Sequence, residues 1–323
     1  MKNYMKYLAL ALALIMAFAC LAGCGGSQGE ATPEGGEGAE GGEVNLISEL
    51  DSLVATDEEL GLAGKYENFE DITDGEIDEA LVGSWQSASG DMIYEYGEDG
   101  TAKANLVQYS ITNEVPYTCV KAGDKNVIIE KVEYMDGSDT EDQYALMMTS
   151  YKIDGDVLYM TTVEEMADPN ITSNYSSLVV LFRMDENGNV PEGAGSVFTL
   201  DALNGEWTTD EGLTITIADG TIAIKGAEGL AEDPMPAHFD ETGKLVIEAN
   251  GAETAYNFGI AQAKVYTDGR DSATAEYSYA MSLTYTGADE NDVPNIKGAM
   301  MDWHSEYDYD DYYYSLNVSR PLA

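Results

Sequence analysis

The residue types that most often carry acid–base chemistry are few in this chain. It has two histidines, His238 in "PMPAHFDETG" and His304 in "MDWHSEYD", and a lone histidine beside a loop is usually structural or solvated. No Gly-x-Ser-x-Gly elbow, His-Glu-x-x-His pair or phosphate-binding glycine loop occurs in the sequence. Paired carboxylates are abundant, but in so acidic a chain their proximity carries little information. We therefore expect no catalytic residues and no cofactor.

Metal-binding chemistry has one candidate, the segment "DENGN" at residues 185–189. It places oxygen ligands at alternating positions, as at the start of a calcium-binding loop. Such a loop needs glycine at position six and glutamate at position twelve, where this chain has Val190 and Ser196. We predict a turn here and no metal site. Weak cation binding by clustered carboxylates remains an alternative role for the acidic surface.

The most unusual stretch is the tail "EYDYDDYYYSL" at residues 306–316. In an extended strand Tyr312 and Tyr314 share one face. One interpretation is a last strand with that face in the core. The other is an aromatic and carboxylate surface that stacks on a sugar or wraps a small ligand, with Trp303, Tyr312 and Tyr314 as candidate ligand-binding residues. Apolar residues at helical spacing over 296–304 would form either a lid or a packing element.

The N-terminus carries targeting chemistry. Lys2 and Lys6 precede an apolar run that ends in Leu-Ala-Gly-Cys24, and this order is typical of a secretory signal peptide. The run is too short for a membrane-spanning helix. Its end resembles the lipobox of bacterial lipoproteins. The resemblance implies that residues 1–23 are removed, that Cys24 is lipidated with acyl chains such as palmitate, and that the protein is anchored to the bacterial cell membrane on its extracytoplasmic side.

The remaining cysteines and the charge limit the possible partners. Loss of Cys20 with the signal peptide and lipidation of Cys24 leave Cys119, so no intrachain disulfide can form. Sixty acidic residues against 15 basic ones give a net charge of −45, which excludes nucleic acid as a partner and disfavours adsorption on anionic lipid. We interpret the charge as a solvated acidic shell. The expected contact with the membrane is through the N-terminal lipid.

The segments that follow differ in amino-acid composition and periodicity. Residues 24–44 form a linker of mainly glycine, glutamate and small residues, which we expect to be flexible and disordered, with a reach of roughly 25 Å. Residues 45–73 begin with Leu46, Leu50 and Leu53 at helical spacing, which predicts a short amphipathic helix. From residue 74 onward, runs rich in Val, Ile, Thr and Tyr alternate with Asp-Gly turns. This pattern predicts an all-β region of antiparallel strands.

The β region contains an internal repeat. "LVGSW" ends at Trp85 and "LNGEW" ends at Trp207, and an Asp-Gly-Thr turn follows each. Further on, "GDKNVIIE" (123–130) aligns with "GKLVIE" (243–248), and each copy closes with an apolar strand that carries Arg183 or Arg320. We predict two tandem antiparallel β-barrel domains, 74–190 and 197–323, with the boundary in the Pro/Gly-rich residues 187–196.

Gly-x-Trp on a first strand and arginine on a last strand resemble the lipocalin superfamily, especially the short lipocalin-like domains of bacterial lipoproteins. The resemblance implies that each tryptophan packs under the closed end of its barrel and that the arginine lies across its face. Strand parity predicts that Arg183 and Arg320 point inward. We therefore expect Trp85 with Arg183, and Trp207 with Arg320, as structural pairs within about 6 Å.

The leading functional hypothesis is a non-enzymatic extracytoplasmic binding protein that holds an apolar small molecule in a barrel or a partner at its rim. The competing hypothesis is a ligandless structural or interaction lipoprotein of the cell envelope, and an enzyme with an unrecognised site is a third. Cavity volume separates the first two. A ligand barrel needs at least about 300 Å³, whereas side chains can fill a small eight-stranded barrel.

Overall fold

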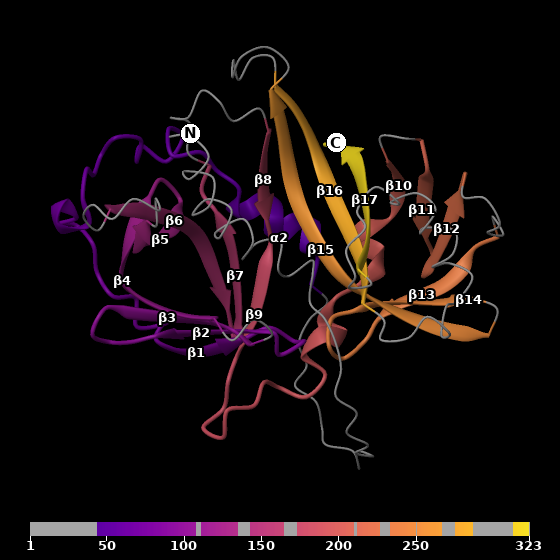
Figure 1. The fold of residues 1–323 in the computed structure, drawn as a ribbon, viewed down its shortest axis with the longest axis horizontal. Coiled ribbons are helices and arrows are strands. Elements are labelled where there is room, and N and C mark those ends of the chain that lie inside the picture. Colours follow the sequence, from indigo (N-terminus) through magenta and orange to yellow (C-terminus); the bar gives the residue numbers. More distant parts are fainter. Residues whose placement is uncertain are drawn as a thin grey trace. The chain divides into compact units, whose positions relative to one another are not determined.

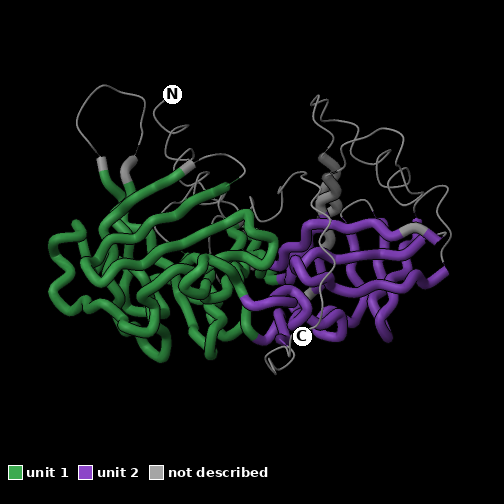
Figure 2. Tube along the Cα trace, turned by 90° about the horizontal axis from the view of Figure 1, so that it is seen from below, with its two compact units in different colours: residues 1–19, 49–190, 261–277 green, residues 20–48, 191–260, 278–323 purple. Residues whose placement is uncertain are grey.

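The computed structural model describes residues 44–107, 111–134, 143–164, 173–209, 212–226, 233–249, 251–266, 275–286 and 313–322. The chain forms two compact units (Figure 2). Unit 1 contains residues 49–190 and 261–277, and unit 2 contains residues 191–260 and 278–323, each with part of the N-terminal region. The predictions at Cys24, Trp303, His304 and Tyr312 fall outside the described residues.

Unit 1 is built on a closed antiparallel barrel, called barrel 1 below (Figure 1). Its strands follow the chain order around the barrel with β8 left out, and β9 closes on β1. They are β1 (Gly83–Gln86), β2 (Met92–Tyr96), β3 (Thr101–Leu106), β4 (Ile111–Ala122), β5 (Lys125–Tyr134), β6 (Gln143–Asp154), β7 (Val157–Thr162) and β9 (Val179–Arg183).

Unit 2 contains the second barrel, barrel 2, which closes through pairing of β14 with β15. Its strands are β10 (Gly205–Thr208), β11 (Thr214–Ala218), β12 (Thr221–Lys225), β13 (Met235–Phe239), β14 (Leu245–Ala249), β15 (Ala252–Tyr266), β16 (Ala275–Thr286) and β17 (Tyr313–Pro321). The predicted all-β fold with two antiparallel barrels in tandem is confirmed.

One strand lies outside this repeat. β8 (Ser173–Ser177) pairs antiparallel with residues 261–265 of β15, and both segments belong to unit 1. The Nζ of Lys264 on β15 lies 3.4 Å from the carboxylate of Glu164. Both side chains are buried, at 7% and 6% exposure. The sequence did not predict this pairing.

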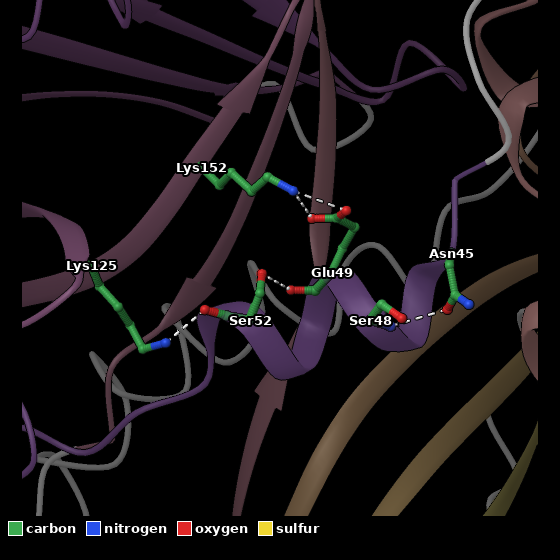
Figure 3. A network of polar contacts seen from close by, with 6 residues as sticks. All are labelled: Asn45, Ser48, Glu49, Ser52, Lys125 and Lys152. Carbon is green, nitrogen blue, oxygen red and sulfur yellow. Dashed lines mark hydrogen bonds and ion pairs between the residues drawn. The ribbon is translucent and has the colours of Figure 1, made fainter.

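The predicted short helix is present as α2 (Leu46–Leu53), with Leu46, Leu50 and Leu53 buried. Asn45 caps it, because its side-chain oxygen accepts a hydrogen bond from the Ser48 amide at 3.0 Å. Polar contacts from the strands of barrel 1 hold the helix (Figure 3). Lys152 on β6 reaches Glu49 at 2.7 Å, and the Lys125 amine donates to the carbonyl of Ser52 at 2.6 Å.

The residues that follow α2 cover an outer face of barrel 1. Leu60 and Leu62 belong to one apolar cluster with Val127 and Ile129 of β5 and Met148 of β6. The same strands turn their alternate residues into the barrel. β5 is therefore buried on both faces, and the segment that precedes the repeat is part of the packing of unit 1.

Three short 3-10 helices complete the described elements: η1 (Phe69–Asp71), η3 (Ala194–Val197) and η4 (Leu200–Leu203). The last one directly precedes β10 and Trp207. Within the described part of the chain, no helix is both long and apolar enough to span a membrane.

Candidate functional site: the interior of barrel 1

The end of each barrel beside its Gly-x-Trp motif, called the closed end below, contains a tryptophan stacked with an arginine. The guanidinium carbon of Arg183 lies 4.0 Å from the centroid of the Trp85 ring, and that of Arg320 lies 4.5 Å from Trp207. Both distances are within the predicted range of about 6 Å. Both indoles are fully buried. The inward parity of the two arginines is therefore as expected.

The backbone conformation at this end and the position of Arg183 explain why the motif includes a glycine. The Trp85 indole donates to the carbonyl of Leu81 at 2.8 Å, and Arg183 donates to the carbonyl of Val82 at 3.0 Å. Gly83 has φ 128°, and a Cβ there would lie 3.1 Å from Nη1 of Arg183. A side chain at this position would be strained and would crowd the guanidinium. Leu-x-Gly-x-Trp is therefore a structural motif of the closed end.

Three buried tyrosines of barrel 1 contact one another. Tyr94 and Tyr96 on β2 stack with ring centroids 6.2 Å apart, and Tyr117 on β4 meets Tyr96 edge to face at 5.1 Å. The Tyr117 hydroxyl donates to the carbonyl of Gly97 at 3.0 Å. Burial raises the pKa of Tyr117 to about 12. The Tyr117 phenol therefore stays neutral at physiological pH.

Glu130 is the unexpected residue of this interior. It is 6% exposed, lies on β5, and is paired in register with Tyr117. Within the described residues no hydrogen bond or ion pair to its carboxylate occurs. Burial raises its pKa from 4.5 to about 7, because an ionised carboxylate loses its hydration without gaining a counter-charge. The carboxylate in turn adds to the effect of burial in raising the pKa of Tyr96.

Glu130 and its neighbours line a cavity of about 40 Å³. Two of its lining residues, Thr162 and Val179, lie at the ends of β7 and β9 that are remote from the Asp154–Val157 turn. The lining combines two aromatic rings, thioethers, hydroxyls and one carboxyl group: Tyr94, Tyr96, Glu130, Met147, Thr149, Met160, Thr161, Thr162, Ser177 and Val179.

Barrel 2 provides an internal comparison, because its strands have matching registers. Trp85 pairs with Tyr94 and Gly83 with Tyr96, as Trp207 pairs with Ile215 and Gly205 with Ile217. Across β4 and β5 Tyr117 pairs with Glu130, and across β13 and β14 Ala237 pairs with Ile247. The amides of Tyr117 and Ala237 also donate to equivalent turn carbonyls, those of Gly100 and Gly220.

The two interiors therefore differ in chemistry at equivalent places. Where barrel 1 has Tyr94, Tyr96, Tyr117 and Glu130, barrel 2 has Ile215, Ile217, Ala237 and Ile247. The four barrel 2 residues are buried. An aliphatic interior is thus compatible with this backbone, and the polar interior of barrel 1 is not required by the fold.

This comparison corrects the sequence alignment of "GDKNVIIE" with "GKLVIE", which matched Glu130 to Glu248. β4 and β5 are joined by a two-residue turn between Ala122 and Lys125, whereas Phe239 pairs with Leu245 across a five-residue loop. The difference shifts the match by one residue, which moves a strand residue to the opposite face. Glu248 is exposed, and the true counterpart of Glu130 is Ile247.

The other predicted positions have ordinary environments. His238 is an exposed residue of β13. The segment 185–189 is a turn, as predicted, in which Asp185 accepts hydrogen bonds from the amides of Asn187 and Asn189, both at 2.8 Å. Cys119 is free and buried, and burial raises its pKa. Tyr314 lies in β17, where it pairs with Tyr285 of β16.

No cluster of three or more His, Cys, Asp or Glu side chains suited to a metal ion occurs among the described residues. Comparisons with protein-family models, with curated proteins and with solved structures found no match.

Proposed function

We propose that the chain is a non-enzymatic, lipid-anchored extracytoplasmic binding protein in which barrel 1 holds a small ligand and barrel 2 is a filled structural barrel. The observation that carries the proposal is the difference between Glu130 and Ile247 at one register position of a duplicated fold. A structural role would be served by an aliphatic residue at both. Function resides in such local differences rather than in the fold itself.

The free-energy cost of Glu130 supports this assignment. An ionised carboxylate buried without a partner destabilises a fold, and the pKa of about 7 corresponds to about 3 kcal/mol for holding the charge at high pH. Barrel 2 avoids that cost with Ile247. Ionisable groups with perturbed pKa values that face a cavity are candidates for binding sites.

We further propose that both barrels are lipocalin-like and that Cys24 carries the membrane anchor. The closed eight-strand topology, the Gly-x-Trp motifs and the stacked arginines support the first part. The signal-peptide pattern supports the second part. Membrane fractionation tests the anchor: Cys24→Ala should give an uncleaved or soluble chain, and Cys20→Ala should change nothing. An anchored, processed Cys24→Ala chain would contradict it.

One observation favours the alternative of a ligandless envelope protein. The cavity of about 40 Å³ is far below the roughly 300 Å³ typical of pockets for drug-sized ligands. If barrel 1 binds nothing, Glu130 contributes only a pH-dependent loss of stability. The two proposals therefore differ in whether a small molecule enters this cavity.

The test is a fragment screen read by ¹³C-methyl methionine NMR on the full chain. Met147 and Met160 line the cavity, and Met281, which is buried in β16 of unit 2, serves as the internal control. We expect a subset of neutral and charged fragments of about three heavy atoms to shift the two barrel 1 methyls saturably and to leave Met281 unchanged. A screen in which no fragment shifts Met147 or Met160 selectively would refute ligand binding in barrel 1.

A further inference from the structure

The cavity of barrel 1 contains a negative charge without a counter-charge. Arg183 is the cationic side chain of the described interior, and it is engaged at the closed end with Trp85 and the carbonyls of Ala80 and Val82. Lys131, the neighbour of Glu130, points to the opposite face and pairs with Glu70 at 2.6 Å. The other buried cation described in unit 1, Lys264, is paired with Glu164 at 3.4 Å. Among the described residues no cation is therefore paired with Glu130, and we look to a bound ligand for the positive charge that would stabilise its ionised form.

The other titratable groups of the interior do not compensate for this charge. From β2 these are Tyr94 and Tyr96, from β4 they are Tyr117 and Cys119, and from β6 the group is Tyr151, whose hydroxyl donates to Asp78 at 2.6 Å. Burial raises the pKa of Tyr96, Tyr117, Cys119 and Tyr151. These four groups therefore stay neutral between pH 6 and 8 and supply no cation.

The aromatic lining favours the same ligand charge. Tyr94 and Tyr96 both line the cavity, with their rings nearly parallel at 12°. Tyrosine rings attract cations within about 6 Å of their centroids, and the attraction is larger where water is excluded. The hydroxyls and thioethers of Thr149, Thr162 and Met160 add acceptors for N–H donors.

The cavity volume limits the size of the cation. One water requires about 10–15 Å³ of this kind of space, so about 40 Å³ accommodates roughly three non-hydrogen atoms. A primary ammonium group with one or two carbons fits this volume. A trimethylammonium group is larger. An anion would meet the Glu130 carboxylate, and a neutral alkyl group would leave that carboxylate unpaired.

We propose that the cavity of barrel 1 binds the primary ammonium end of a small amine, with the Glu130 carboxylate as counter-ion and the Tyr94 and Tyr96 rings beside it. This inference rests on the proposed function, since it names the class of ligand for the same cavity.

The experiment titrates the full chain with ethylammonium chloride at pH 8 and constant ionic strength, followed through the methionine methyl resonances. Ethanol and acetate are neutral and anionic probes of similar size, and sodium chloride controls for ionic strength. We expect saturable shifts at Met147 and Met160 with a Kd in the millimolar range, because the binding free energy available to about three heavy atoms allows no tighter binding. Met281 should not shift.

Two variants test the role of the charge. Glu130→Gln should weaken ethylammonium binding at least tenfold, and Glu95→Gln, which removes an exposed charge from β2, should leave it unchanged. Glu130→Asp keeps the charge and should retain a preference for ethylammonium over ethanol.

The outcomes separate this inference from the proposed function. If ethanol shifts Met147 and Met160 as strongly as ethylammonium, or if Glu130→Gln binds ethylammonium as the wild type does, the amine assignment is wrong and a binding cavity remains. If neither these probes nor any fragment of the wider screen shifts those methyls, the inference and the proposed function both fail.

Discussion

Replacement of Glu130 by glutamine should make barrel 1 more stable above neutral pH. The folded pKa of about 7 lies above the ordinary value of 4.5, so the folded state keeps a proton that the unfolded state has lost. The stabilisation is complete below about pH 4.5 and is lost as pH rises through 7. At 1.36 kcal/mol per pKa unit the loss is about 3 kcal/mol. Glutamine is uncharged at every pH and avoids it.

The assay is urea unfolding of the fluorotryptophan-labelled chain followed by ¹⁹F NMR, because Trp85 reports barrel 1 and Trp207 reports barrel 2. At pH 8 Glu130→Gln should raise the free energy of unfolding at Trp85 by about 3 kcal/mol, and at pH 5 by less than about 1 kcal/mol. The Trp207 transition should not move.

The control is Glu95→Gln, which relieves the same general repulsion in a chain of net charge −45 from an exposed site. If the two variants show the same pH dependence at Trp85, the stabilisation comes from net charge alone and not from the buried carboxylate of Glu130.

Three further results are expected. Arg183→Lys should lower the stability of barrel 1 by about 0.5–2 kcal/mol, the range for a cation–π contact, and Arg320→Lys should do the same for barrel 2; equal effects of either variant on both ¹⁹F transitions would contradict the pairing. Gly83→Ala should cost more than about 1 kcal/mol in barrel 1, because φ is 128° and Arg183 lies 3.1 Å away, whereas Ala80→Gly, in the preceding turn, should have a smaller effect. A chain that starts at residue 74 should lose the Trp85 transition and keep that of Trp207, since it uncovers Val127 and Ile129; circular dichroism and ¹⁹F NMR check this, and an unchanged Trp85 transition would contradict it.

The architecture could be predicted from sequence because its determinants are local. The glycine of each Leu-x-Gly-x-Trp motif has positive φ, at 128° for Gly83 and 141° for Gly205. Each arginine shares strand parity with apolar neighbours, and α2 shows plain helical periodicity. The glycine and arginine features recur in both copies and identify the repeat without knowledge of the tertiary structure.

The candidate site could not be predicted because it depends on register. Glu130 follows two isoleucines in "NVIIEKV", and a strand buried on both faces gives no alternation from which to assign its direction. The two barrels differ in the length of the loop before the strand that carries Glu130 or Ile247. An alignment of sequence letters alone does not show this difference, and it placed Glu130 against the exposed Glu248. Pairing of β8 with β15 was missed for a related reason, since nothing in either strand encodes a partner about 90 residues away.

The most direct test of the account is an NMR pH titration of the Glu130 side-chain carboxyl carbon, assigned by comparison with Glu130→Gln. We expect a midpoint near 7 in the free protein, consistent with the buried carboxyl group, and a lower midpoint when ethylammonium is bound. A midpoint near the ordinary value of 4.5 in the free protein would mean that the carboxyl is solvated or already paired, and would contradict the claim that barrel 1 contains an unpaired buried charge.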